Sequence, residues 1–417
     1  MNSAKSPQPP APPPKGPGNP PVPPPPAALS ANQQVAQGQR PAPKIFTIEQ
    51  MVKDAYIKKV SDIHIRVGST TRYRIRGELV KAPGQGRITP EIFEAYLTEI
   101  LTPVQRQQFA EKLELDTAIF YPGVVRCRVN CFQSLNGGAM VLRLINLNIP
   151  AIDELGLPDV LKDIITRPQG LILVTGPTGS GKSTTMAAMI RHLNENAKKH
   201  IVTIEDPIEF VHQSLKCLIS QREVGLHTHE FHDALRAVLR EDPDVILIGE
   251  MRDRNTVNTA LQAAQTGHLV LGTLHTRSAI NAINRLLNLY NADEQPAIRV
   301  QITDSLVAVI AQLLMPNTEG GRTAVHDILI NTPAMQDYLL KGNEEDALRL
   351  MEKGSHDGMQ IINQALYQFV LEGRIAIEEA EKHSPDPNDL DRRLRTGGYD
   401  AASAAREINT KTGFRPL

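Results

Sequence analysis

The feature that most constrains this chain is a glycine-rich turn placed between an apolar run and a helical pattern. Residues 171–190 read LILVTGPTGSGKSTTMAAMI, in which the apolar letters predict a strand and STTMAAMI predicts a helix. The turn matches the pattern G-x-x-x-x-G-K-[ST], and this pattern requires a strand before it and a helix after it. The sequence therefore predicts a phosphate-binding loop that joins a strand to a helix.

The residue types in this turn suit the binding of a nucleotide triphosphate. Glycines let the backbone wrap closely around phosphate oxygens, and the amides at the helix start carry partial positive charge. We expect Lys182 to reach the β and γ phosphates and Ser183 to ligate Mg²⁺, so ATP and Mg²⁺ are the expected cofactors. The predicted nucleotide-binding residues are Gly176, Pro177, Thr178, Gly179, Ser180, Gly181, Lys182, Ser183 and Thr184.

Apolar strands alternate with helical patterns throughout residues 169–330. The strands read GLILVTG, HIVTIED, DVILIGE and LVLGTLHT, and helical stretches such as TVNTALQAAQ separate them. Nearly continuous apolar strands of this kind predict a mostly parallel sheet that is covered by helices on both faces. The expected fold class is therefore α/β, with a doubly wound domain at its centre.

Composition and pattern divide the rest of the chain. Residues 1–43 hold about half of the 31 prolines and predict a disordered tail, either a solvated extension or a polyproline II ligand. Residues 44–149 combine amphipathic helices with alternating strands, which predicts a small α+β domain. We interpret residues 150–168 as a linker, residues 331–395 as a C-terminal helical part and residues 396–417 as a polar tail.

The overall composition argues against several classes of protein. A net charge of -1, 4% aromatic residues and no tryptophan give no support for a nucleic-acid partner. Cys127, Cys131 and Cys217 are an odd number without zinc-site spacing, which indicates a reducing compartment and core side chains. The chain contains no uncharged apolar run long enough to span a bilayer, so we expect a cytoplasmic protein without stable membrane insertion.

Acidic side chains follow two of the predicted strands. Glu205, Asp206 and Glu209 come after the strand IVTI, and Glu250 follows VILIG. Because parallel strands end at the edge that carries the phosphate loop, these carboxylates can reach a γ phosphate, where hydrolysis needs a water-positioning group. The pair Gly249-Glu250 replaces the more typical Asp-Glu pair. This leaves open whether Glu250 holds the Mg²⁺ water shell or activates the nucleophile.

Two histidines flank the predicted strand LVLGTL. His268 precedes this strand and His275 follows it. A histidine at the carboxyl end of the strand can contact the γ phosphate, whereas an isolated histidine is more often structural. The strand-end position favours His275 as a site residue, and both interpretations stay open for His268.

Four motifs occur in order along the chain: GPTGSGKST, TIEDPIE, LREDPDVILIGEMRD and TGHLVLGTLHT. With these motifs, residues 45–395 resemble the secretion-superfamily hexameric ATPases, and within them the PilT-like twitching-motility motors of type IV pilus retraction. The resemblance implies a PAS-like N-terminal domain, a RecA-like P-loop ATPase domain and Mg²⁺-dependent ATP hydrolysis. It also implies a ring of six chains at the inner-membrane face, which acts on pilin through a membrane platform protein.

The same resemblance implies roles for individual residues. Glu209 would be the general base that prepares the attacking water, and Glu250 would act on Mg²⁺ or water. His268 and His275 would sense the nucleotide. In the smaller domain, RCRVNCF and VLRLI resemble the family's arginine strands. The arginines implied as clamps on the γ phosphate are Arg128 and Arg143, with Arg126 as a further candidate.

Two differences between this sequence and the usual sequences of the superfamily indicate which member it resembles most. Extension and type II secretion ATPases usually carry a tetracysteine zinc insertion, but residues 286–327 contain no cysteine, which favours retraction. Retraction motors usually carry the helix AIRNLIRE, whereas residues 334–341 read AMQDYLLK, which suits an accessory, PilU-like paralogue. The predicted function is a pilus-retraction ATPase. The alternatives are a pilus-extension or type II secretion ATPase, and a nucleotide-binding accessory subunit of the retraction motor. A paralogous retraction ATPase is a possible partner.

Overall fold

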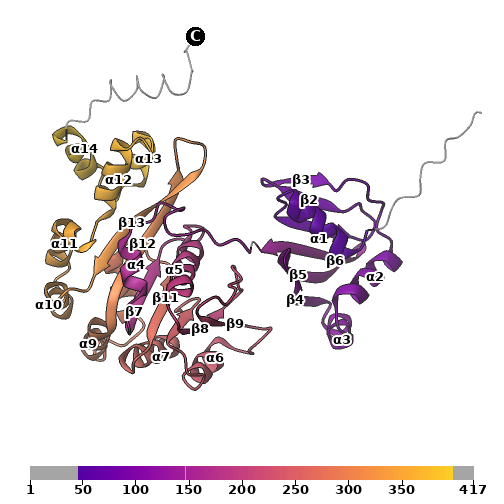
Figure 1. The fold of residues 1–417 in the computed structure, drawn as a ribbon, viewed down its shortest axis with the longest axis horizontal. Helices are drawn as coiled ribbons and strands as arrows, with labels where there is room; N and C mark the ends of the chain where they lie inside the picture. Colours follow the sequence, from indigo (N-terminus) through magenta and orange to yellow (C-terminus); the bar gives the residue numbers. More distant parts are fainter. Residues whose placement is uncertain (1–45, 146, 398–417) are drawn as a thin grey trace, which may run out of the picture. The chain divides into compact units, whose positions relative to one another are not determined.

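The computed structural model describes residues 46–145 and 147–397. The predicted tail at residues 1–43 lies outside these described residues, and so does nearly all of the predicted tail at residues 396–417. Within the described ranges, no helix is both long enough and apolar enough to cross a membrane. Two β-sheets organise these residues, as Figure 1 shows.

The first sheet has, among the described residues, six antiparallel strands in the order β3-β2-β1-β6-β5-β4. Threonine side chains at positions 47, 89 and 102 accept backbone amides and so begin the three helices that accompany it. The strands are β1 (Asp62–Arg66), β2 (Arg72–Ile75), β3 (Glu78–Lys81), β4 (Glu114–Tyr121), β5 (Val125–Ser134) and β6 (Gly137–Ile145). The helices are α1 (Ile48–Ile57), α2 (Pro90–Ile100) and α3 (Pro103–Lys112).

Two of the cysteines belong to the core of this first sheet. Cys127 and Cys131 lie on β5 and are buried among apolar side chains. Burial raises the pKa of each thiol to about 12, so both stay protonated at neutral pH. Their burial matches their interpretation as small apolar core side chains.

The second sheet has, within the described residues, seven strands in the order β13-β12-β7-β11-β10-β8-β9. Neighbouring strands are parallel, except that β13 runs antiparallel to β12. The strands are β7 (Gly170–Thr175), β8 (His200–Glu205), β9 (Leu218–Glu223), β10 (Val245–Ile248), β11 (Leu269–Leu274), β12 (Leu306–Pro316) and β13 (Arg322–Ile330). Helices cover both faces: α5 (Lys182–Asn196), α6 (Phe231–Val238), α7 (Arg254–Gln265), α8 (Ala279–Leu287) and α9 (Gln295–Ser305). The predicted α/β fold with a mostly parallel sheet is confirmed.

The segment 150–168, which the sequence predicts to be a linker, contains the helix α4 (Val160–Ile165). Leu161, Ile164 and Ile165 are buried and belong to the apolar cluster that includes the side chains of α5. Their spacing of three and four residues places them on one face of the helix. This part of the segment therefore belongs to the core of the second sheet.

Helices follow the last strand. The helix α10 contains the sequence AMQDYLLK and begins after Thr332, whose side chain accepts the amide of Met335. Leu366, Leu390 and Leu394 join Met315 and Val325 of the last two strands in a separate apolar cluster. The helices are α10 (Pro333–Lys341), α11 (Glu344–Lys353), the 3₁₀ helix η1 (Ser355–Asp357), α12 (Ile362–Leu371), α13 (Ile377–His383) and α14 (Pro387–Thr396).

Leu271→Ala tests how much the packing of the central strand β11 contributes to the stability of the fold. Leu271 lies on β11 and is fully buried, so its truncation leaves a cavity that the packed neighbours fill only in part. We expect the free energy of unfolding in urea to fall by about 2–5 kcal/mol. The matched control is Leu348→Ala, at a side chain that is 47% exposed, and it should change this free energy by less than about 0.5 kcal/mol. Equal losses in the two variants would contradict the expectation.

Candidate functional site

The predicted phosphate loop joins β7 to α5 and has the backbone conformation that its glycines allow. Gly176, Gly179 and Gly181 have φ values of 148°, 81° and 88°, a region that residues with a Cβ rarely adopt. Gly181 is the N-cap of α5 and supplies no side chain to the first amides of the helix. These amides are therefore placed to donate hydrogen bonds to an anion.

Lys182 folds back over this loop. Its ammonium donates to the carbonyl oxygen of Gly176 at 2.8 Å and to that of Pro177 at 3.2 Å. Burial lowers the pKa of Lys182, and the nearby carboxylates of Glu250 and Glu209 oppose this shift. The positive charge of the lysine thus lies at the loop, facing the acidic groups that follow β8 and β10.

A cavity of about 520 Å³ adjoins the loop. Residues from the loop, from the first turns of α5 and from the segments after β8, β10 and β11 line it, because these parallel strands end at the same edge of the sheet. The structure brings the following predicted site residues to this cavity: Lys182, Ser183, Glu209, Glu250 and His275.

Glu250 lies between two cationic or titratable partners. Its carboxylate is 2.6 Å from the guanidinium of Arg252 and 3.1 Å from Nε2 of His275. The hydrogen bond from Arg252 is the main cause that lowers the pKa of Glu250, and the charge of His275 adds to this effect. Glu250 is therefore an ionised carboxylate with a weakened tendency to take up a proton.

Glu205 and Glu209 differ in their surroundings although they lie close together, Glu205 as the last residue of β8 and Glu209 four residues after it. The carboxylate of Glu205 accepts hydrogen bonds from the Thr203 hydroxyl at 2.6 Å and from the Gln221 amide at 3.1 Å. Burial raises the pKa of Glu205. Glu209 is exposed and lines the cavity, so its carboxylate is accessible to a ligand or to water.

His268 lies at the other end of its strand. It immediately precedes β11, whereas the phosphate loop and His275 follow the carboxyl ends of β7 and β11. Its Nδ1 is 3.0 Å from the carbonyl oxygen of Ala263 at the end of α7. The structure thus places His268 away from the lining of the cavity and gives it a structural contact.

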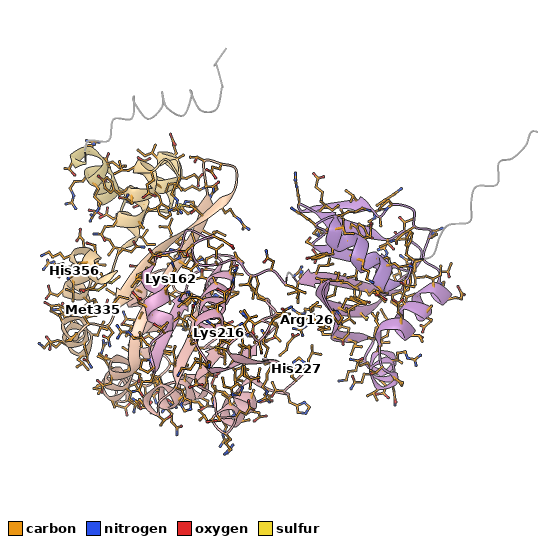
Figure 2. The ribbon with its side chains drawn as sticks, viewed as in Figure 1. Arg126, Lys162, Lys216, His227, Met335 and His356 are labelled. Carbon is orange, nitrogen blue, oxygen red and sulfur yellow. The ribbon has the colours of Figure 1, made fainter. Side chains whose placement is uncertain are left out.

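The candidate arginines lie on the first sheet. Arg128 on β5 and Arg143 on β6 are directly opposite each other in the strand register. Arg143 donates to Asp62 at 2.8 Å, and 69% of its side chain is exposed. Arg126, which Figure 2 labels, is buried and pairs with Glu223 at 2.7 Å. Neither Arg128 nor Arg143 lines the cavity next to the phosphate loop.

Some residues of the cavity have no role in the sequence-based prediction. Arg252 comes two residues after Glu250 in the motif GEMRD, and this short spacing is a signal that could have been used. Arg322 begins β13 and reaches the same cavity from the far end of the sheet order. Its sequence context carries no comparable signal, because its approach depends on the antiparallel pairing of β12 with β13.

Asp327→Asn provides a test of electrostatics beside the site. One carboxylate oxygen of Asp327 accepts the amide of Ala279 at the start of α8, and burial raises the pKa of Asp327 from 3.8 to about 6. Between these two pH values the unfolded chain loses this proton while the folded chain keeps it, so the stability of the parent falls as pH rises. We expect the free energy of unfolding in urea at pH 7.5 to be about 2–3 kcal/mol higher for the variant than for the parent.

The gain from Asp327→Asn should vanish near pH 4, where Asp327 is protonated in the folded parent. The control is Asp337→Asn, at a side chain that is 55% exposed, and no such pH dependence is expected there. A free-energy difference from the parent that is the same at pH 4 and pH 7.5 would contradict the assignment of the raised pKa to Asp327.

The strand, loop and helix, with acidic groups on adjacent strand ends, define a P-loop ATPase domain that follows a smaller antiparallel domain. The family model described as "Type II/IV secretion system protein" matches residues 37–382. The chain belongs to this family.

Relatives within the family include two proteins of Pseudomonas aeruginosa. The type IV pilus retraction ATPase PilT is 43% identical over 79% of this chain and 96% of its own length. The type IV pilus ATPase PilU is 39% identical over 85% of this chain and 93% of its own length. A crystal structure of the pilus retraction motor PilT with bound ADP matches with a TM-score of 0.78 and 41% identity, covering 83% of this chain and 99% of that one. The predicted family, fold class and ATPase activity are confirmed.

Proposed function

We propose that this chain hydrolyses ATP to drive type IV pilus retraction and so supports twitching motility. The observation that carries this proposal is the meeting of Lys182, Glu209 and Glu250 at one cavity beside the phosphate loop. The chain that carries this cavity is 43% identical to a pilus retraction ATPase along almost all of that relative's length. Nucleotide binding at the loop is the common requirement of every role considered below.

Mg²⁺ fits the oxygen donors of the cavity. The hydroxyl of Ser183 lies in the first turn of α5, and the ionised carboxylate of Glu250 lines the same cavity. Hydroxyl, carboxylate and phosphate oxygens are the ligands that Mg²⁺ prefers. When bound, the ion would supply positive charge that neutralises the charge developing on the phosphate oxygens. We propose Ser183 as its direct ligand and Glu250 as the acceptor of hydrogen bonds from its water shell.

The surroundings of Glu209 and Glu250 suggest which carboxylate is the general base and which acts at the metal. A general base works best when its pKa is close to the working pH, and Arg252 lowers the pKa of Glu250 away from that range. Glu209 is exposed to the cavity and free to approach a water molecule at the γ phosphate. We therefore assign the general base to Glu209, and we assign charge stabilisation at the metal to Glu250.

His275 is our proposed nucleotide sensor. Its Nε2 is 3.1 Å from the carboxylate of Glu250. A change in the charge around Glu250 therefore alters the electrostatic interaction with the imidazole. For His268 we retain the sensing role implied by the family as a weaker proposal, because its contact with Ala263 already accounts for its position. A variant series at the two positions separates them: His275→Ala should alter ATP turnover, and His268→Ala should alter mainly stability.

We further propose that six copies form a ring and that Arg128 and Arg143 clamp the γ phosphate. Both side chains are partly exposed, at 39% and 69%, and their direct opposition in the register of β5 and β6 places them on the same face of the sheet. Two paired guanidiniums suit the several oxygens of a terminal phosphate. The expected partners of the ring are an inner-membrane platform protein and a paralogous retraction ATPase, with which it would act at the cytoplasmic face of the membrane.

Deletion of the gene in its host tests the direction of the motor. Cells that keep their pili but no longer twitch would support retraction. Cells that lose their pili would overturn the proposal in favour of pilus extension or type II secretion. Complementation with the Glu209→Gln variant should fail in the first case, because that variant is expected to bind ATP without hydrolysing it.

A second candidate function is that of an accessory subunit of the retraction motor. The observation that favours it is α10, where AMQDYLLK carries no arginine. The similarity to PilU, which covers 85% of this chain, agrees with it. ATP turnover by the purified chain alone decides between the two: brisk turnover supports an autonomous motor, and turnover that requires a paralogous ATPase supports the accessory role.

A further inference from the structure

The strand β12 passes directly against the phosphate loop at Gln312, a residue that is only 1% exposed. A Cβ added to Gly176 would lie 2.3 Å from the backbone oxygen of Gln312. A Cβ added to Gly181 would lie 2.9 Å from the side-chain nitrogen of Gln312. Two glycines of the loop are thus required by the same neighbour, in addition to their positive φ values.

The hydrogen bonds of Gln312 fix the orientation of its amide. Its Nε2 donates to the carbonyl oxygen of Ser180 at 2.6 Å, and a carbonyl oxygen can only accept. The amide oxygen must therefore face the other way, where it accepts from the Thr185 hydroxyl at 2.7 Å. Gln312 consequently holds the loop before the helix and the first turn of α5 with one side chain.

The same amide oxygen also meets His326 of β13, at 3.2 Å from its Nε2. Because this oxygen is an acceptor, the imidazole must carry its proton on Nε2. His326 is 1% exposed, and burial lowers its pKa to about 4, so it is a neutral donor at physiological pH. The carbonyl oxygen of His326 accepts in turn from the side chain of Gln360, just before α12.

We propose that Gln312 and His326 are positioning residues that hold the phosphate loop in its nucleotide-binding conformation. They act on the loop through Ser180 and on α5 through Thr185, the residue two positions after Ser183. Neither side chain lines the cavity at the loop, so neither touches the nucleotide there. The network carries no charge, and its geometry is therefore independent of salt and of pH near neutrality.

This relay of Gln312, His326 and Thr185 holds the loop through groups that do not face a phosphate. Loop amides that face a phosphate cannot be held by bonds of their own to the protein, so the loop must be held through its carbonyl and side-chain groups. Gln312 contacts the carbonyl oxygen of Ser180 and the hydroxyl of Thr185 from the buried strand β12, where close packing limits the rotation of side chains. Loss of either hydrogen bond should weaken nucleotide binding before it affects the chemical step.

The test compares His326→Phe with His326→Gln. Phenylalanine removes the donor, whereas the glutamine amide can return an N–H near the position of Nε2. We expect His326→Phe to raise the dissociation constant of a fluorescent ADP analogue and the KM for ATP by about tenfold, with kcat changed by less than about twofold. His326→Gln should bind ADP within about twofold of the parent.

Thr185→Val serves as a second variant that removes one hydroxyl without changing the volume of the side chain, and it carries the test if His326→Phe does not fold. The matched control is His356→Phe, at an exposed histidine that Figure 2 labels. Parental ADP affinity in both His326→Phe and Thr185→Val would overturn the proposal, even with lowered unfolding midpoints. Failure of His326→Gln to restore binding would overturn it as well, because lost packing would then be the cause.

This inference rests on the nucleotide-binding role of the loop, and ADP affinity measures that role without pilus retraction. If cells that lack the gene twitched like the parent strain, the proposed function would be wrong, but the inference about the relay would still hold. Conversely, if His326→Phe and Thr185→Val bound ADP with the affinity of the parent, the inference about the relay would be wrong, but the proposed retraction function would still hold.

Discussion

Glu209→Gln should lower the kcat of ATP hydrolysis by about 10²–10⁴-fold while ADP still binds with the affinity of the parent. The amide keeps the size of the side chain but cannot accept a proton from water. Glu209 is exposed at the cavity, so its substitution removes no buried contact and the fold should be unchanged. Steady-state hydrolysis and titration with a fluorescent ADP analogue measure the two quantities separately.

The control for this variant is Glu345→Gln, at a side chain that is 76% exposed on α11, and it should hydrolyse ATP at the parental rate. Parental hydrolysis by Glu209→Gln would show that another group takes the proton. The comparison with Glu250→Gln then becomes informative. We expect that variant to lose turnover together with its response to Mg²⁺ concentration, because Glu250 is assigned to the metal.

Lys182→Ala should weaken ADP and ATP binding by at least about 100-fold and abolish measurable turnover. The ammonium is the cation that the loop presents to the β and γ phosphates, and truncation removes a positive charge that faces the carboxylates of Glu209 and Glu250. Unfolding midpoints measured with and without ADP report the loss directly. The parent should gain stability from ADP, and the variant should not.

The matched control is Lys216→Ala, at an exposed lysine that Figure 2 labels and that lies just before β9. It should keep the stabilisation by ADP. If Lys182→Ala were stabilised by ADP as strongly as the parent, the loop amides alone would account for binding, and the lysine would have to act only during hydrolysis.

The local parts of the site could be predicted from sequence because its signals are short in range. The phosphate loop is one contiguous string, and Glu209, Glu250 and His275 each come within four residues of the end of an apolar strand. A parallel sheet brings such strand ends to one edge regardless of the order of the strands. The same argument cannot apply to His268, which precedes its strand and consequently lies at the opposite end.

Contacts that depend on strand order could not be predicted in this way. Gln312 meets the loop because β12 pairs with β7, and Arg322 reaches the cavity because β13 turns back along β12. Nothing within a few residues of either position signals that pairing. The helix α4 could not be predicted for a different reason: its six residues contain a single set of apolar side chains at helical spacing, which is too few to distinguish a helix from a linker.

The contacts of Lys182 with its own loop bear on the exchange of nucleotides. Its ammonium donates to two carbonyl oxygens of the loop, at 2.8 and 3.2 Å. Each ammonium has three N–H donors, so two of them are directed into the loop itself. A phosphate that takes over one of these donors exchanges a carbonyl acceptor for a charged oxygen, and the lysine needs no partner beyond its own loop once that phosphate leaves.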